Sequence, residues 1–91
     1  VKVMARVLVK VRVLPSTAEV NVEELKEKIK NAIKEFAEIY RSSITPIAFG
    51  LSALTLEVIL EEKEGVMDKL EEAIMSVGNV GSIEVEGVTR I

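Results

Sequence analysis

Apolar and polar residues alternate at the start of the chain. Every odd position from 3 to 13 is apolar, whereas the even positions include the basic residues Arg6, Lys10 and Arg12. A period of two in β-branched residues predicts a strand with one face in a core. We expect this strand over residues 3–14, because Pro15 cannot donate to a strand ladder.

A helical repeat follows the first strand. Asn21 is a favourable N-cap residue, and Glu24 occupies the position three residues later that a capping box requires. Apolar residues then recur at helical spacing at Leu25, Ile29, Ile33, Phe36 and Tyr40. The pattern predicts an amphipathic helix of about five turns, with Phe36 in the core and Tyr40 near the helix end.

The second half of the chain predicts two strands, a helix and a last strand. Residues 41–47 favour a short edge strand ending at Pro46, and the alternation over residues 51–62 favours an interior strand. Apolar residues at helical spacing mark a second helix from Val66 to Val77, and Gly78 is placed to end it. The last strand begins at Val80, and its alternation slips at Gly87, which suggests a bulge.

The order strand, helix, strand, strand, helix, strand predicts the fold class. We expect an α+β, ferredoxin-like β-α-β-β-α-β sandwich, in which a four-stranded antiparallel sheet carries two helices on one face. Right-handed crossovers would place the first and third strands in the centre. Residues 1–91 are expected to form a single domain, since their composition of 48% hydrophobic and 30% charged residues is that of a globular chain.

Composition removes most catalytic chemistry. The chain has no cysteine and no histidine, which excludes disulfides, thiolate zinc sites and the commonest general base. We therefore expect no catalytic residues, no metal, no cofactor and no enzyme. The net charge of -3 gives no reason to expect nucleic acid or a membrane surface as partner. The absence of cysteine favours a reducing cytoplasm as the location. No apolar run approaches the roughly 20 residues of a membrane-spanning helix.

The central stretch 45–51, Thr-Pro-Ile-Ala-Phe-Gly-Leu, holds one of only two prolines and one of only two phenylalanines. A rigid turn with an aromatic tip between two strands suits display of Phe49 to a partner. The alternative is that Phe49 covers one end of the core.

Three segments resemble archaeal elongation factor 1-beta and the guanine-nucleotide-exchange domain of its eukaryotic counterpart. They are V-L-P-S near the start, T-P-I-A-F-G-L-S-A-L in the middle and I-E-V-E-G-V-T-R-I at the end. The resemblance covers essentially the whole chain in the same element order. It implies exchange activity on elongation factor 1-alpha, in its GDP-bound and nucleotide-free forms, the GTPase that delivers aminoacyl-tRNA to the ribosome.

The resemblance also implies a two-point contact. In the eukaryotic family an aromatic residue of the central loop lies at the partner's surface, and a basic residue beside the C-terminus reaches toward the partner's magnesium and phosphate site. The matching positions are Phe49 and Arg90, where the eukaryotic motifs carry tyrosine and lysine. We expect both side chains near one end of the domain, with Phe49 at least partly exposed. The expected partner-binding residues are Phe49, Arg90, Thr89, Pro46, Ala48 and Gly50.

Two other functions remain open from the residues. A ferredoxin-like small-molecule-sensing or oligomerisation domain would self-associate through its open sheet face or an edge strand, whereas an exchange factor is expected to be a monomer. RNA binding ranks third, because the two central strands contain no aromatic residue on which a base could stack. Its only support is the basic row of the first strand, which charge pairing across the sheet also explains. The acidic partners expected for that row are Glu57, Glu61, Glu84 and Glu86.

Overall fold

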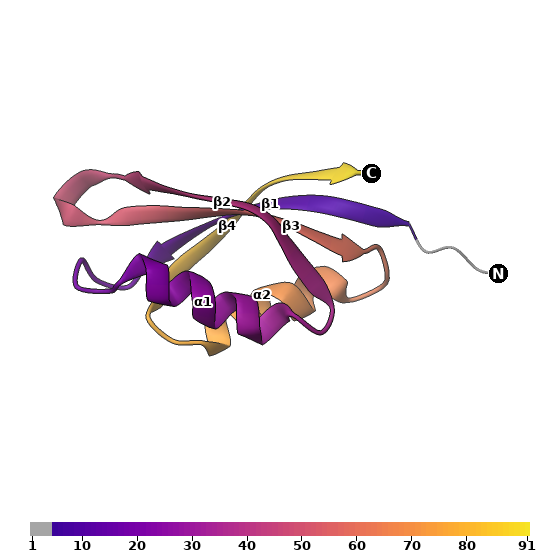
Figure 1. Cartoon of the computed structure of the whole chain (residues 1–91), viewed down its shortest axis with the longest axis horizontal. Coiled ribbons are helices and arrows are strands. Elements are labelled where there is room, and N and C mark those ends of the chain that lie inside the picture. Colours follow the sequence, from indigo (N-terminus) through magenta and orange to yellow (C-terminus); the bar gives the residue numbers. More distant parts are fainter. Residues whose placement is uncertain (1–4) are drawn as a thin grey trace.

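A computed structural model describes residues 5–91 as one four-stranded antiparallel sheet with both helices on the same face (Figure 1). The elements are β1 (Arg6–Pro15), α1 (Val22–Ile33), β2 (Ala37–Pro46), a 3-10 turn η1 (Ala48–Gly50), β3 (Ser52–Glu61), α2 (Val66–Ser76) and β4 (Val80–Arg90). The strand order β2-β3-β1-β4 puts β1 and β3 in the centre. The ferredoxin-like prediction is confirmed. The predicted start of the first strand at Val3 lies outside the described residues.

One apolar core lies between the sheet and the helices. The alternate residues of β1 and β3 point toward it, and the apolar stripes of α1 and α2 cover them. Within residues 5–91 no polar or charged residue is buried. The core residues are Val7, Val9, Val11, Val13, Leu25, Ile29, Ile33, Leu54, Leu56, Val58, Leu60, Val66, Leu70 and Ile74.

Helix α1 begins where the capping pattern predicts. The Asn21 side-chain oxygen accepts hydrogen bonds from the backbone N–H groups of Glu23 at 3.0 Å and Glu24 at 3.2 Å. Asn21→Ala leaves both donors without a protein partner, so we expect the free energy of unfolding to fall by about 1 kcal/mol. Urea denaturation measures this loss. Asn21→Ser retains the cap as a control, and an equal loss in both variants would contradict the assignment.

The prediction that the first helix continues to Tyr40 is wrong. Helix α1 ends at Ile33, the Phe36 N–H donates to the Ile33 carbonyl at 3.0 Å, and β2 begins at Ala37. Phe36 still packs against the core, but from this turn. Ala37 and Ile39 pair with core positions of β3 and share their face of the sheet. Residues 34–40 contain no glycine or proline, so their sequence pattern remains compatible with a helix. Pairing with β3 nevertheless makes residues 37–40 part of a strand.

The other element predictions hold with small shifts. Gly78 and Asn79 follow α2 with φ of 80° and 62°, the left-handed conformation expected where a helix ends. The β1–β4 ladder pairs Lys10 with Gly87 and Val11 with Val85, which leaves Glu86 as an extra residue and confirms the bulge. Strand β2 lies at the sheet edge as predicted, although it is longer than residues 41–47.

The open face of the sheet carries paired charges. Each basic residue of β1 faces an acidic residue across a ladder, as the charge-pairing explanation predicts. The register places Arg6 opposite Glu61, Lys10 opposite Glu57 and Arg12 opposite Glu84. Glu86, also expected as a partner, lies in the bulge and has no residue of β1 opposite it. The Arg6 guanidinium also lies 3.9 Å from the Glu38 carboxylate on β2. The basic row is thus matched by the sheet's own carboxylates.

Candidate functional site

The connection between β2 and β3 is a tight turn with Phe49 at its tip. The Leu51 N–H donates to the Ala48 carbonyl at 3.2 Å, and the Ile47 N–H donates to the Leu51 carbonyl at 2.8 Å. Between these bonds Phe49 and Gly50 both have positive φ, of 59° and 75°. Two left-handed residues in sequence match the right-handed twist of a hairpin, as in a type I′ turn. Backbone hydrogen bonds therefore hold the turn closed.

Phe49 is 94% exposed at this tip, so the display prediction is confirmed and the core-covering alternative is wrong. A left-handed backbone costs a residue with a Cβ atom about 1–2 kcal/mol. No burial of the ring offsets that cost within the chain. Backbone strain at an exposed aromatic side chain is the kind of outlier that motivates a functional hypothesis.

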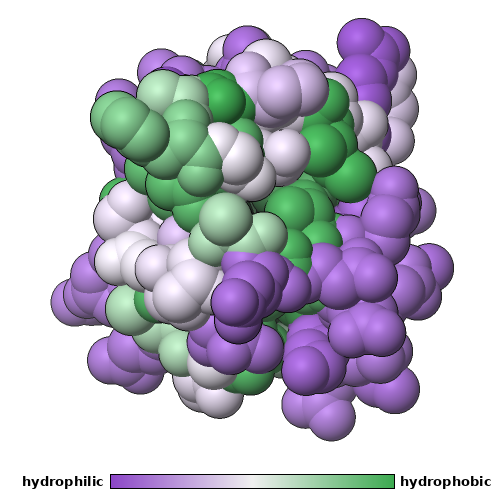
Figure 2. Space-filling model, turned by 90° about the vertical axis from the view of Figure 1, so that its left-hand side faces the viewer, coloured by the Kyte–Doolittle hydropathy of each residue, from purple (hydrophilic) through white to green (hydrophobic). Residues whose placement is uncertain are grey.

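The remaining predicted loop residues support the turn. Pro46 ends β2 opposite Ser52, and Ala48 opens the turn at the surface. A Cβ atom on Gly50 would lie 3.6 Å from the Ala18 Cβ atom, so the β1–α1 connection lies beside the turn. Figure 2 looks onto this end of the molecule and shows hydrophobic surface gathered over its upper part, where the hairpin lies.

Arg90 is the last residue of the edge strand β4, in the part of that strand that pairs regularly with β1. It is in register with Val7, and the Ile91 N–H donates to the Arg6 carbonyl at 3.0 Å. The Arg90 side chain is 71% exposed. Its Nε donates to Glu62 Oε2 at 2.9 Å, and its Nη2 donates to Glu62 Oε1 at 2.5 Å. The hydrogen bond and the charge of Glu62 raise the pKa of the Arg90 guanidinium.

The sequence did not reveal Glu62 as a member of this site. It lies 28 residues before Arg90 in the chain, directly after β3. Because β3 and β4 flank β1, the Arg90–Glu62 pair spans β1 on the helix side, above Val7. Only the strand register brings the two residues together, so no local motif could have identified Glu62.

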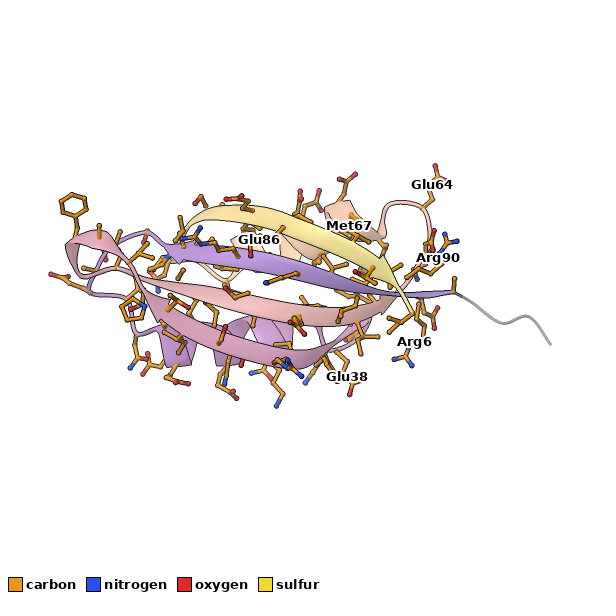
Figure 3. The ribbon with its side chains drawn as sticks, turned by 90° about the horizontal axis from the view of Figure 1, so that it is seen from above. Arg6, Glu38, Glu64, Met67, Glu86 and Arg90 are labelled. Atoms are coloured by element: carbon orange, nitrogen blue, oxygen red, sulfur yellow. The ribbon has the colours of Figure 1, made fainter. Side chains whose placement is uncertain are left out.

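An apolar groove of ≈ 380 Å³ lies beside the Arg90–Glu62 pair. Val88 contributes to it and is 55% exposed, since the helices do not cover this end of β4. The groove is lined by Val7, Glu62, Lys63, Val66, Met67, Val88 and Arg90. Figure 3 shows Met67 and Arg90 at this same end of the molecule. A charged, bidentate pair therefore stands at the rim of an apolar hollow.

The expectation that Phe49 and Arg90 lie near one end of the domain is wrong. Strand β3 starts beside the Phe49 turn and ends beside Glu62, ten residues later. At about 3.3 Å per residue the two sites lie about 30 Å apart. Figure 1 shows the β2–β3 connection at the left and the C-terminus at the right. β4 and β3 both run antiparallel to β1, so the end of β4 lies beside the end of β3.

The structure does not bring Thr89 together with the Arg90 guanidinium. Thr89 pairs with Leu8 on the open face, whereas Arg90 pairs with Val7 on the helix face. Successive residues of a strand point to opposite faces of a sheet, which separates the two side chains. The Thr89 side chain thus lies on the open face of the sheet.

Neither a metal site nor a membrane span is found over residues 5–91. No group of three His, Cys, Asp or Glu residues there is arranged to hold a metal ion. Neither helix is long and apolar enough to cross a membrane.

Solved structures share the fold at low sequence identity. The de novo designed protein Foldit4 matches with a TM-score of 0.65 and 19% identity, covering 92% of this chain and 96% of that one. The C-terminal domain of the MgtC protein from Mycobacterium tuberculosis matches with a TM-score of 0.64 and 12% identity, covering 100% of this chain and 94% of that one. These likenesses concern the fold alone.

Sequence relatives are much closer. Elongation factor 1-beta of Hyperthermus butylicus is 55% identical over 97% of both chains, and that of Staphylothermus marinus is 49% identical over 97% of this chain and 99% of the relative. The EF-1 guanine nucleotide exchange domain matches residues 8–91. The chain therefore belongs to the EF-1 guanine nucleotide exchange domain family, whose role is nucleotide exchange in translation elongation.

Proposed function

We propose that this chain is the exchange factor of elongation factor 1-alpha, and that it promotes GDP release and GTP exchange on that GTPase in the cytoplasm. It acts as one domain over residues 1–91, and as a monomer. The observation that carries the proposal is Phe49, held 94% exposed in a left-handed turn. Family membership supports the exchange role, and the elongation factor 1-beta relatives support the partner.

Exchange needs differential binding rather than covalent catalysis. An exchange factor that binds the nucleotide-free GTPase best lowers the affinity of the GTPase for nucleotide. Bound nucleotide lowers the affinity for the exchange factor by the same ratio. Loosening GDP a thousandfold takes about 4 kcal/mol, at about 1.4 kcal/mol per tenfold. One aromatic anchor and one well-placed cation, with a rim of weaker contacts, can supply a difference of that size. A chain without nucleophile or general base suits this task.

The separation of the two sites gives them different roles. Phe49 docks on one surface of the GTPase, and Arg90, about 30 Å away along the sheet, acts at the nucleotide's magnesium site. A cation brought near bound magnesium and phosphate competes with the ion for the same negative charge. The sheet between them serves as a rigid spacer, since the ladders of β3, β1 and β4 run from one site to the other.

Release of fluorescent GDP from elongation factor 1-alpha of the same source tests the proposal. The unmodified chain should accelerate release in a saturable manner, and the Phe49→Ala, Arg90→Ala double variant serves as a folded control. No acceleration by the unmodified chain would overturn the proposal.

Sedimentation at micromolar concentration tests the monomer. A monomer alone and a one-to-one complex with the nucleotide-free GTPase are expected. A dimer joined through β2 or β4 would favour the oligomerisation alternative, since these are the two edge strands.

A further inference from the structure

We propose that Glu62 is a positioning residue of the exchange reaction: it aims the Arg90 guanidinium out of the end of the sheet toward the GTPase. The inference rests on the proposed role of Arg90 in exchange. It assigns a task to a residue that touches Arg90 in the free chain and that the sequence did not single out.

The bidentate pair leaves part of the guanidinium free. Arginine carries five N–H donors in a planar fork. Glu62 accepts one from Nε and one from Nη2, along a single edge of that fork. The two N–H groups of Nη1 and the second N–H of Nη2 make no bond to Glu62, and one from each nitrogen together form the end of the fork. Arg90 can therefore stay bound to Glu62 and still donate to a phosphate or carboxylate of the partner.

Backbone hydrogen bonds to the start of the described chain hold Glu62 and Ile91, the residue that follows Arg90. The Glu62 N–H donates to the Ala5 carbonyl at 2.7 Å, and on the other side of β1 the Ile91 N–H donates to the Arg6 carbonyl at 3.0 Å. β1 alone separates the two strands, and Glu62 is level with Ala5 whereas Arg90 is level with Val7. Two strand spacings and two residues along the strand put the two backbones about 12 Å apart. That span suits one long side chain from each strand.

Holding the Arg90 side chain in one rotamer before the GTPase binds favours formation of the complex. An arginine side chain has many rotamers, and ordering it only on contact with the partner would weaken binding. Arg90 is 71% exposed and would sample those rotamers if Glu62 did not hold it. Val7, in register with Arg90, is 5% exposed and lines the apolar groove beside the pair. One edge of the guanidinium is bound to Glu62, and the side chain stays largely exposed for contact with a partner.

The opposite role, in which Glu62 restrains Arg90 from reaching the partner, fits the geometry less well. An ion pair exposed to this degree is weak and exchanges readily with water. Such an ion pair would hardly slow the movement of the Arg90 guanidinium toward the partner. It does favour one rotamer of the Arg90 side chain over the others. The two roles predict opposite effects when the carboxylate is removed.

Glu62→Gln tests the inference. Glutamine keeps the size of the side chain but offers one acceptor oxygen, so the bidentate pair is lost. We expect the maximal exchange rate at saturating factor to fall about two- to fivefold, the range that a weak ion pair can supply. Glu64→Gln removes the same charge from the same connection and should leave the rate unchanged. Figure 3 shows Glu64 pointing away from Arg90.

A spectroscopic readout separates pairing from activity. In the isolated chain the ¹⁵N–¹H signal of the Arg90 Nε should move in Glu62→Gln and stay in place in Glu64→Gln. In the Arg90→Ala background, Glu62→Gln should cause no further slowing. An equal slowing there would mean that Glu62 contacts the GTPase itself, which overturns the positioning role.

The rates also separate this inference from the proposed function. A slow Arg90→Ala beside a Glu62→Gln variant as fast as the unmodified chain, or faster, overturns only the role of Glu62. Full activity of Arg90→Ala overturns the role of Arg90, and the inference with it.

Discussion

Phe49→Ala is expected to slow exchange on elongation factor 1-alpha by about a hundredfold at factor concentrations below saturation. Truncation of an aromatic anchor at the centre of an interface costs about 2–4 kcal/mol of binding, and each 1.4 kcal/mol is tenfold. The ring is 94% exposed, so the variant loses no packing within its own fold. The defect should therefore appear as weaker binding to the nucleotide-free GTPase, with the melting temperature retained. Titration calorimetry and fluorescent-GDP release measure the two sides of this expectation.

Two variants serve as controls for Phe49. Tyr40→Ala removes the other strongly exposed aromatic ring, 59% exposed on β2 and away from the turn, and should bind normally. Phe49→Gly removes both the anchor and the strain of a left-handed residue with a Cβ atom. It should bind the GTPase as poorly as Phe49→Ala does, and its free energy of unfolding should be higher than that of Phe49→Ala by up to about 1 kcal/mol. Equal losses in Phe49→Ala and Tyr40→Ala would contradict the anchor assignment.

Arg90→Ala is expected to lower the maximal exchange rate by at least about tenfold, the size of effect that an arginine hot spot supplies. Because Phe49 still docks about 30 Å away, binding to the nucleotide-free GTPase should change much less than the rate. Stopped-flow release of fluorescent GDP over a range of factor and magnesium concentrations separates the two quantities. The slowing should shrink as magnesium is lowered, since the ion with which Arg90 competes is then absent.

Charge and geometry at Arg90 can be distinguished by two further changes. Arg6→Ala removes one positive charge from the same end of the sheet but on the open face, and should leave the rate unchanged. Arg90→Lys keeps the charge but not the planar fork. It should retain part of the rate and lose the bidentate contact with Glu62. If Arg6→Ala slowed exchange as much as Arg90→Ala, the overall charge of this end would be responsible.

Much of the fold could be predicted from short segments. The alternation in β1 and β3, the Asn21 cap and the left-handed residues after α2 each depend on neighbours within a few positions. The Phe49 turn belongs to this group, since Pro46 restricts the backbone before the aromatic residue and Gly50 permits the positive φ that follows it. These features act locally, so their chemistry is visible in the order of the residues.

The boundary between α1 and β2 could not be predicted in this way. Residues 34–40 satisfy a helical period, and no proline or glycine stops the helix. Pairing of Ala37 and Ile39 with β3 satisfies backbone groups along a ten-residue ladder and places two more apolar side chains against the core. A gain that involves residues about twenty positions away is absent from any local pattern.

The candidate site divides along the same line. The residues themselves predicted a turn at Phe49 but left display and core covering both open, and similarity to a family singled out Arg90. Only the paired strands showed that these two side chains lie at opposite ends of the sheet, and that Glu62 forms an ion pair with Arg90 across β1. The physical reason is the distance along the sequence between the residues that interact. Turns and helix caps depend on contacts within one segment. The register of paired strands, and ion pairs between strands, arise only when packing of the whole core aligns the strands.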